Sequence, residues 1–438
     1  MRKLLLPLVF MLFSIHLHAQ PTEAPVDADY YPPASDEKVR LGQLLFFDKI
    51  LSGNRNISCA TCHHPMAGTG DGLSLPVGEG GRGIGVMRVA PVRTILQRVP
   101  RNAPHIFNIG AMEFTAMFAD GRIEVDPTQP SGFRTPAGDD LPMGLENVVA
   151  AQAMFPVTNP IEMAGQPGEN RQGRLVDNLP ALWNFIARKL RRNEEYVELF
   201  KAAFPDKIFS AGDITFVDAA NAIAAFEIAV GRYDNSPFDK FLRGDQSALT
   251  DNQKAGMDLF YGDAGCGGFC HSGKFQTNHR YFSIAMPQIG PGVGDGIGGV
   301  EDFGRERVTG NEGDRYRFRV PSLRNISVTA PYGHAGAYDT LESVVEHYND
   351  RVGSLMSYDP AEAVLPANRN LDPLDFVAMS NQEILAAIAA STRATELELT
   401  DTQKRQLVEF MGALTDPGVY DMRWQVPDSV PSGLPVRD

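Results

Sequence analysis

Apolar positions recur at helical spacing in one segment near the start of the chain and in a second segment past its middle. Residues 35–48 (SDEKVRLGQLLFFD) open on Ser35 or Asp36 as a candidate N-cap and continue as an apolar stripe. The stripe consists of Val39, Leu41, Leu44 and Leu45. Residues 249–263 (LTDNQKAGMDLFYGD) offer Thr250 as the N-cap. Both segments contain Gly-x-x-Leu-Phe-aromatic, so the pattern predicts the same helix twice.

Two further stretches repeat in the same order. Residues 104–109 (PHIFNI) are echoed by residues 321–326 (PSLRNI), and residues 145–152 (LENVVAAQ) by residues 341–348 (LESVVEHY). Three matches in register indicate an internal duplication. We therefore expect an all-α fold of two related domains.

The first residues have the pattern of a secretory signal peptide. Arg2 and Lys3 precede an apolar run that ends in small and polar residues near Ala19. This pattern predicts export, and we expect the mature protein in the periplasm. The expected segments are the signal peptide 1–19, the two domains 20–235 and 236–420, and a Pro-rich tail 421–438.

Charge and hydropathy narrow the range of partners. No later segment approaches the roughly 20 uninterrupted apolar residues of a spanning helix, which predicts no membrane insertion. Loss of Arg2 and Lys3 takes the net charge from -14 to -16. This excess of negative charge disfavours nucleic acid and anionic membranes as partners and permits a basic protein partner.

The first cysteine pair has the c-type haem signature. Residues 59–63 read CATCH, so Cys59 and Cys62 can bond a porphyrin while His63 ligates the iron. Half of a zinc site and a redox Cys-x-x-Cys pair are the alternatives. Zinc lacks further cysteine ligands, and a redox pair does not use the histidine. The sequence therefore favours haem.

The second cysteine pair has one residue more between its thiols. Cys266 and Cys270 are separated by Gly267, Gly268 and Phe269, and His271 follows directly. The duplication places this motif where the first domain has CATCH, and the glycines offer conformational freedom to absorb the extra residue. We predict a second haem c, with a structural metal site or a single lost thioether bond as alternatives.

The repeat also predicts what faces each iron. Thr340 is a good N-cap for the helix ending near Tyr348, whose phenol falls on the apolar face and suits either an iron or an ordinary hydrogen bond. Gln152 holds the same place in the first copy, and an amide is a poor iron ligand. The first iron is therefore expected to be open. Ten residues on, Glu162 lies among Pro156, Pro160 and Met163.

Glu162 is a candidate acid–base residue for peroxide. A carboxyl group in an apolar loop beside an open haem could move a proton between peroxide oxygens, with its pKa raised by desolvation. A loop cap and an ion-pair partner are equally good interpretations of this residue taken alone.

Together these residues resemble the di-haem cytochrome c peroxidase and MauG superfamily. The resemblance covers about residues 34–415. It is carried by LGQLLFFD, CATCHHP, RNAP, DGR, QAMFPVTNPIEM, FDKFLRGD, VPSLRN, TAPYGHAG and LESVVEHY. It implies two cytochrome c-like domains with one haem c each, and hydrogen peroxide as the substrate.

The resemblance also implies roles for individual residues. The haem on His63 would react with peroxide, with Gln152 and Glu162 in its distal pocket, and the haem on His271 would be six-coordinate. Tyr348 stands where MauG has tyrosine and the peroxidases have methionine. Asn102 together with the Thr329 and Pro331 carbonyls would bind calcium between the domains. His334 matches a family histidine near the haems, although a structural histidine fits equally well.

Departures from the family concern three places. The stretch after CATCH has Glu79 where family peroxidases carry a distal histidine, so the first haem looks ready for peroxide without reductive activation. Ala119 replaces the tryptophan usually placed between the haems, so electron exchange needs another route. Residues 124–144 form an insertion whose prolines and glycines predict a loop, which either shapes a partner surface or decorates the domain.

The sequence therefore predicts a di-haem oxidoreductase that uses hydrogen peroxide. Its reductant would be a small cytochrome c or copper protein, as in a peroxidase, or the side chain of a protein substrate, as in MauG. The alternatives are an electron-transfer cytochrome with both irons six-coordinate, which could recruit Met66, Met87 or Met163, and a peroxide sensor without turnover.

Overall fold

The computed structural model describes residues 30–166, 168–393 and 396–437, so the predicted signal peptide lies outside the described residues. Helices carry most of the ordered structure. The helices are α1 (Asp36–Phe47), α2 (Cys59–Cys62), α3 (Val148–Ala153), α4 (Leu179–Leu190), α5 (Glu194–Ala203), α6 (Phe216–Val230), α7 (Pro237–Leu242), α8 (Asp251–Tyr261), α9 (Glu306–Thr309), α10 (Leu341–Asn349), α11 (Arg351–Met356), α12 (Gln382–Ser391) and α13 (Asp401–Ala413). No helix in the described ranges is long and apolar enough to cross a membrane.

The N-caps predicted from the sequence are confirmed. Ser35 accepts a hydrogen bond from the Lys38 amide at the start of α1. Thr250 and Gln253 form a capping box on α8, and Thr340 accepts from the Ser343 amide on α10. Satisfying the first free amides in this way fixes where each helix begins.

Short antiparallel strands accompany the helices, which the all-α prediction did not include. The strands are β1 (Ala116–Met117), β2 (Ile123–Val125), β3 (Phe133–Arg134), β4 (Tyr281–Phe282) and β5 (Phe318–Arg319). They form the sheets β1-β2-β3 and β4-β5. Helical content is as predicted, but the fold is not purely helical.

The insertion was predicted as a loop, and that prediction is wrong for its first residues, which belong to β2, and for β3 in its middle. Glu124 of β2 pairs with Ala116 on one side and Arg134 on the other. The Glu124 carboxylate also accepts from the Tyr281 hydroxyl at 3.2 Å and pairs with Arg305. The insertion therefore holds the strand region of the first half against β4 of the second half.

The same helix crossing occurs twice. Gly42 of α1 lies so close to α6 that a Cβ atom would stand 1.8 Å from the Ala222 carbonyl oxygen. Gly256 of α8 meets α13 equally closely, with 1.9 Å to the Gln406 carbonyl oxygen. Glycine is needed at both positions because any side chain would separate the helices.

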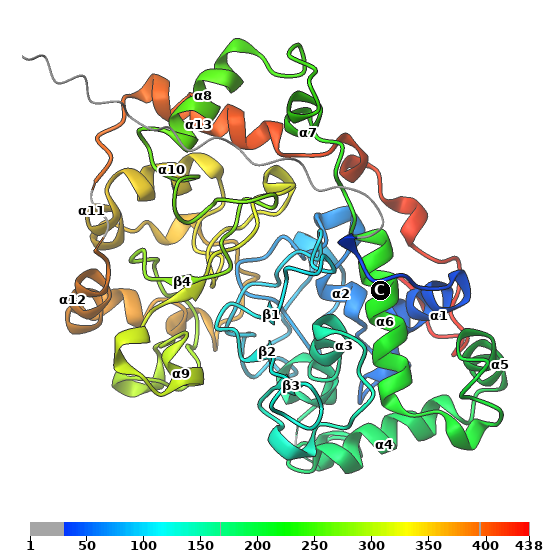
Figure 1. Cartoon of the computed structure of the whole chain (residues 1–438). Coiled ribbons are helices and arrows are strands. Elements are labelled where there is room, and N and C mark those ends of the chain that lie inside the picture. The colour runs from blue at the N-terminus through cyan, green and yellow to red at the C-terminus, as the bar shows by residue number, and fades with distance from the viewer. Residues whose placement is uncertain (1–29, 167, 394–395, 438) are drawn as a thin grey trace, which may run out of the picture.

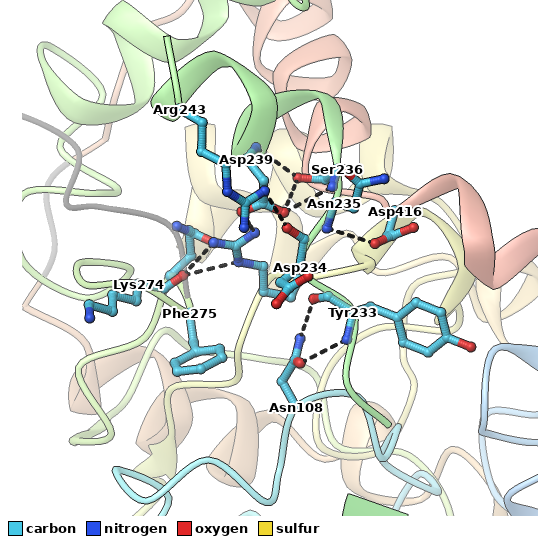
Figure 2. A network of polar contacts seen from close by, with 12 residues as sticks. Asn108, Tyr233, Asp234, Asn235, Ser236, Asp239, Arg243, Lys274, Phe275 and Asp416 are labelled. Carbon is cyan, nitrogen blue, oxygen red and sulfur yellow. Dashed lines mark hydrogen bonds and ion pairs between the residues drawn. The ribbon is translucent and has the colours of Figure 1, made fainter. Parts of the chain in front are cut away.

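The segment after α6 links the two halves of the chain. The main cores lie on either side of it, one built mostly from residues 31–230 and one from residues 238–414. Figure 1 shows α1, α4, α5 and α6 on one side of the molecule and α8 and α10–α13 on the other. Figure 2 shows the link, where the Asn108 amide pairs with the Tyr233 backbone and the Asn235 amide donates to Asp416.

The C-terminal tail returns to the first half of the chain. The Ser432 hydroxyl donates to the Asp48 carboxylate at 2.6 Å, and the Asn193 amide donates to the Pro431 carbonyl at 2.8 Å. Val430 is buried in the core of the first half. The tail is thus packed against α1 and α5, a contact that the Pro-rich composition did not predict (Figure 1).

Candidate active site

Both cysteine motifs open on one cavity of about 500 Å³. We call it the shared cavity. Every site residue predicted from the sequence lines it. These residues are Cys59, Cys62, His63, Asn102, Gln152, Glu162, Cys266, Cys270, His271, Thr329, Pro331, His334 and Tyr348. The fold therefore brings together residues that are up to about 290 positions apart along the chain, as a duplicated cofactor site would require.

The first motif is a single turn of helix. Ser58 precedes α2, and its amide donates to the Thr61 hydroxyl at 3.0 Å. The His63 amide closes the turn on the Cys59 carbonyl at 2.9 Å. The His63 Nδ1 atom lies 3.2 Å from the Thr69 carbonyl oxygen, and the ring also hydrogen-bonds the Pro104 carbonyl. Carbonyls only accept, so the contact with Thr69 places a proton on Nδ1.

The second motif repeats this arrangement with a wider turn. The His271 amide donates to the Cys266 carbonyl at 2.8 Å, which is one residue further back than in the first motif. The His271 Nδ1 atom lies 2.9 Å from the Gln276 carbonyl oxygen, and the ring hydrogen-bonds the Pro321 carbonyl. The extra residue is thus absorbed by lengthening one hydrogen-bonded turn.

The glycines of the second motif act differently from the prediction. Neither Gly267 nor Gly268 is among the described residues with positive φ, so unusual backbone conformation is not their contribution. Gly267 is required for space, because a Cβ atom would stand 2.3 Å from the Tyr261 ring. Phe269 is 59% exposed and packs on Phe282 at 5.1 Å between ring centroids.

The four thiols and two imidazoles fit haem better than the alternatives. All four cysteines are free, and burial raises the pKa of Cys59 to about 12 and that of Cys266 to about 11. A redox Cys-x-x-Cys pair needs a thiol pKa near or below neutrality. Among the described residues no group of three or more His, Cys, Asp or Glu could hold a metal ion. A ligating histidine that donates Nδ1–H to a carbonyl is the usual arrangement at an iron.

Glu162 lies on a π-helical turn, Pro160–Ala164, that begins at the N-cap Asn159. The Asn159 amide nitrogen donates to Glu162 Oε1 at 2.7 Å. Burial raises the pKa of Glu162, while the positive charge of Arg122 and the Asn159 hydrogen bond oppose the rise. The carboxyl therefore combines a raised pKa with a fixed orientation, as a proton-transferring group requires.

The loop after the first motif packs against this turn. We call residues 76–83 the distal loop. A Cβ atom on Gly78 would stand 2.1 Å from the Ile161 carbonyl oxygen. Glu79 is 6% exposed and accepts from the Asn54 and Asn56 amides at 2.8 and 2.6 Å. The Arg88 guanidinium donates to the Val77 and Gly78 carbonyls, so the loop is held in place from both sides.

Tyr348 and His334 line the part of the cavity that belongs to the second half. Burial raises the pKa of the Tyr348 phenol, and no hydrogen bond to its hydroxyl is found within the described ranges. His334 stacks on Phe318 at 3.7 Å, and its Nε2 atom has no partner in the described structure. Burial lowers the pKa of His334 to about 4, so the ring is neutral.

The residues proposed for calcium all line the shared cavity. The Asn102 side-chain nitrogen donates to the Leu73 and Ser74 carbonyls at 2.9 and 3.3 Å, which orients its oxygen as a free acceptor. Thr329 and Pro331 line the same cavity. Amide and carbonyl oxygens are ligands that suit calcium.

Sequence reasoning missed several residues of the cavity. Glu227 is 5% exposed with one carboxyl oxygen lacking a partner, and Arg319 Nη1 also lacks one in the described structure. His105 also lines the cavity. The unpartnered Arg319 donor could pair with a haem carboxylate. The signal was the position of His105 and Arg319 within or next to the repeated PHIFNI and PSLRNI stretches.

The methionines considered as alternative ligands differ in position. Met66 is 50% exposed and Met87 is 80% exposed, and neither lines the shared cavity. Met163 is 3% exposed and does line it. Of these three methionines, only Met163, which follows Glu162 on the π-helical turn, is placed to ligate the first haem.

Comparison with known proteins gives a consistent result. Residues 36–247 match the family model described as di-haem cytochrome c peroxidase. The cytochrome c551 peroxidase of Pseudomonas aeruginosa is 31% identical over 334 residues, which are 76% of this chain and 78% of that protein. The methylamine utilization protein MauG of Methylorubrum extorquens is 31% identical over 317 residues, or 72% and 69%.

Solved structures agree. A MauG-like protein associated with microbial copper homeostasis aligns with a TM-score of 0.59 at 26% identity, covering 94% of this chain and 97% of that chain. The di-haem peroxidase BthA of Burkholderia thailandensis shares the fold with a TM-score of 0.57 at 18% identity, covering 98% and 97%.

Proposed function

Because the chain belongs to the di-haem cytochrome c peroxidase family, we propose that hydrogen peroxide reacts at a haem c held by Cys59, Cys62 and His63, with Glu162 as the acid–base residue. Family membership makes the protein a di-haem oxidoreductase with a peroxide-dependent redox function and two haem c groups. The observation that carries the finer assignment is that Glu162 and His63 line one cavity, with the carboxyl oriented by Asn159.

The residues of the first site have different roles in this proposal. A haem iron with an open axial position supplies peroxide binding and electron transfer to the O–O bond. Glu162 takes the proton from one peroxide oxygen and returns it to the other, for which its raised pKa is suited. Gln152 offers an amide to orient peroxide. The distal loop, held by Arg88 and by the Asn54 and Asn56 contacts of Glu79, keeps the site open without rearrangement.

The second haem c belongs, in this proposal, to Cys266, Cys270 and His271, with Tyr348 as the further axial ligand. Ligation would require the phenol to lose a proton despite burial, and a ferric iron supplies the charge that favours the phenolate. His334 would remain a neutral histidine between the haems. Calcium at Asn102, Thr329 and Pro331 would join the two halves.

The division into domains 20–235 and 236–420 is part of the same proposal, as are export to the periplasm and the choice of electron donor. The repeated helix crossings at Gly42 and Gly256 support the division. A small cytochrome c or copper protein would make the enzyme a peroxidase, and oxidation of a protein side chain would make it MauG-like.

Stopped-flow mixing of the oxidised holoprotein with hydrogen peroxide tests the assignment. Glu162→Gln keeps the Asn159 hydrogen bond but cannot carry the proton, so the reaction should slow about 100-fold or more. Glu227→Gln is the matched control, because Glu227 is a second buried carboxyl on the same cavity. It should react like the parent.

The same experiment separates the rivals. A parent protein whose haems never react with peroxide would be an electron-transfer cytochrome. A protein that reacts once but shows no turnover with any reductant would be a sensor. Equal rates for Glu162→Gln and the parent would refute the acid–base role of Glu162.

A further inference from the structure

The two candidate iron ligands contact equivalent prolines. The His63 ring hydrogen-bonds the Pro104 carbonyl, and the His271 ring hydrogen-bonds the Pro321 carbonyl. These prolines begin the repeated PHIFNI and PSLRNI stretches. Each stretch is held at the equivalent asparagine. Asn108 and Asn325 both adopt positive φ. Their backbone amides donate to the carbonyls of Gly231, after α6, and of Leu414, after α13.

The residues that follow these prolines meet each other. The His105 Nδ1 atom accepts from the Phe107 amide at 3.2 Å, which places the ring proton on Nε2. The ring hydrogen-bonds the Ser322 carbonyl of the other half, so Nε2–H is the donor. Ser322 is 3% exposed, and its hydroxyl donates to the Phe275 carbonyl at 2.8 Å. Both ends of the contact are therefore fixed.

A continuous route connects the two ligands as a result. It runs from the His63 ring through Pro104 to His105, across one hydrogen bond to Ser322, and through Pro321 to the His271 ring. Adjacent residues along it are joined covalently, and the remaining links are hydrogen bonds. Ala119 has no aromatic group that could provide a competing route at its own position.

We propose that His105 is the bridging residue for electron exchange between the two haems. This inference rests on the proposed ligation by His63 and His271. One electron leaves the second haem, whose iron is oxidised by one unit, and reaches the first haem, which is reduced by one unit. No atom moves, and His105 stays neutral throughout, since its Nδ1 position is already occupied by the Phe107 amide.

Pulse radiolysis of the oxidised holoprotein tests the bridge. A sub-stoichiometric dose of reducing radicals places electrons on the haems, and absorbance follows their redistribution between the two. His105→Phe keeps a ring but removes the Nε2–H donor, and redistribution should slow about 10- to 100-fold. His105→Gln can still donate to the Ser322 carbonyl and should restore most of the rate. His105→Ala provides a second loss of the donor if the phenylalanine variant is not recovered.

His279→Gln is the matched control, because His279 also joins the two halves, through Glu113 at 2.9 Å. It should redistribute electrons at the parental rate. Visible spectra and midpoint potentials of all variants measure the driving force for electron transfer between the haems. At equal driving force, a changed rate of electron transfer reports a change in electronic coupling. Redistribution at the parental rate in both His105→Phe and His105→Ala would overturn the proposal. The peroxide reaction of Glu162→Gln tests the proposed function independently of this bridge. If the pyridine haemochrome assay finds only one haem in the parent protein, that result refutes the proposed function.

Discussion

Arg324 and Asp239 form an ion pair inside the second half of the protein, with side chains that are 1% and 0% exposed. The remaining Arg324 donors reach the Lys274 carbonyl at 3.0 and 2.7 Å. Asp239 also accepts from the Ser236 hydroxyl at 2.7 Å, at the end of the link between the two halves. The pair therefore ties the PSLRNI stretch to the first helix after the link.

Breaking this pair should destabilise the protein strongly. Asp239→Asn leaves the Arg324 charge buried without a counter-charge, which costs about 3 to 5 kcal/mol. The free energy of unfolding of the holoprotein in guanidinium chloride measures the loss. Asp421→Asn is the control, because the Asp421–Arg423 pair is 59% and 76% exposed and its loss should leave the midpoint unchanged. A similar midpoint for both variants would contradict the prediction.

Glycine substitutions on paired helices should have opposite effects. Gly256→Ala forces α8 away from α13, because the new methyl group would stand 1.9 Å from the Gln406 carbonyl oxygen, and overpacking costs about 1 to 3 kcal/mol. Gly412→Ala on α13 meets only the Ser327 hydroxyl at 4.0 Å and should stabilise the helix by about 0.5 to 1 kcal/mol. Thermal unfolding gives the sign of the change in Tm for each variant. Changes of the same sign would be inconsistent with the close crossing of α8 and α13.

Ionisation of Glu227 should make the free energy of unfolding fall as the pH rises. Burial raises the pKa of Glu227 from 4.5 to about 8, so between these values the folded protein holds a proton that the unfolded chain has lost. The contribution is complete below pH 4.5 and is lost as the pH rises through 8, with a slope of at most about 1.4 kcal/mol per pH unit. Glu227→Gln should remove this slope from a series of unfolding curves between pH 5 and 8. Glu198→Gln, on the exposed face of α5, should follow the parent.

Removal of the Tyr348 hydroxyl should change one haem only. Tyr348→Phe keeps the ring in place but takes away the proposed oxygen ligand, so the low-spin signal of the second haem should convert to high-spin. Electron paramagnetic resonance of the oxidised protein detects the change. Tyr332→Phe is the control, since the Tyr332 hydroxyl donates to the Ile326 carbonyl at 2.9 Å and lines the same cavity. An unchanged spectrum for Tyr348→Phe would mean that another group ligates the iron.

The sequence predicted what depends on local pattern. Helix starts at Ser35, Thr250 and Thr340 follow from capping chemistry that acts within three residues. The haem motifs and the repeat follow from residue spacing, and the family comparisons confirm the di-haem assignment. The placement of Glu162 beside the first motif came from the duplicated pattern together with the resemblance.

Features that depend on contacts between distant segments were not predictable. His105 contacts Ser322 across 217 positions of sequence, and both residues line the shared cavity. Glu124 likewise pairs with Arg305 from the other half of the chain, and the predicted loop contains residues of β2 and β3 that pair as strands. The widened turn of the second motif could be expected from its extra residue, but the role of Gly267 in making room for Tyr261 required the packed structure.

The return of the C-terminal tail to α1 has a consequence for biogenesis. The contacts of Asp48 with Ser432, and of Asn193 with Pro431, form only after the last residues of the chain have been delivered. The packing of the first half is therefore completed only by residues from the very end of the chain. Deleting the residues after 425 should thus lower the thermal stability of the first half, because both hydrogen bonds and the burial of Val430 are lost.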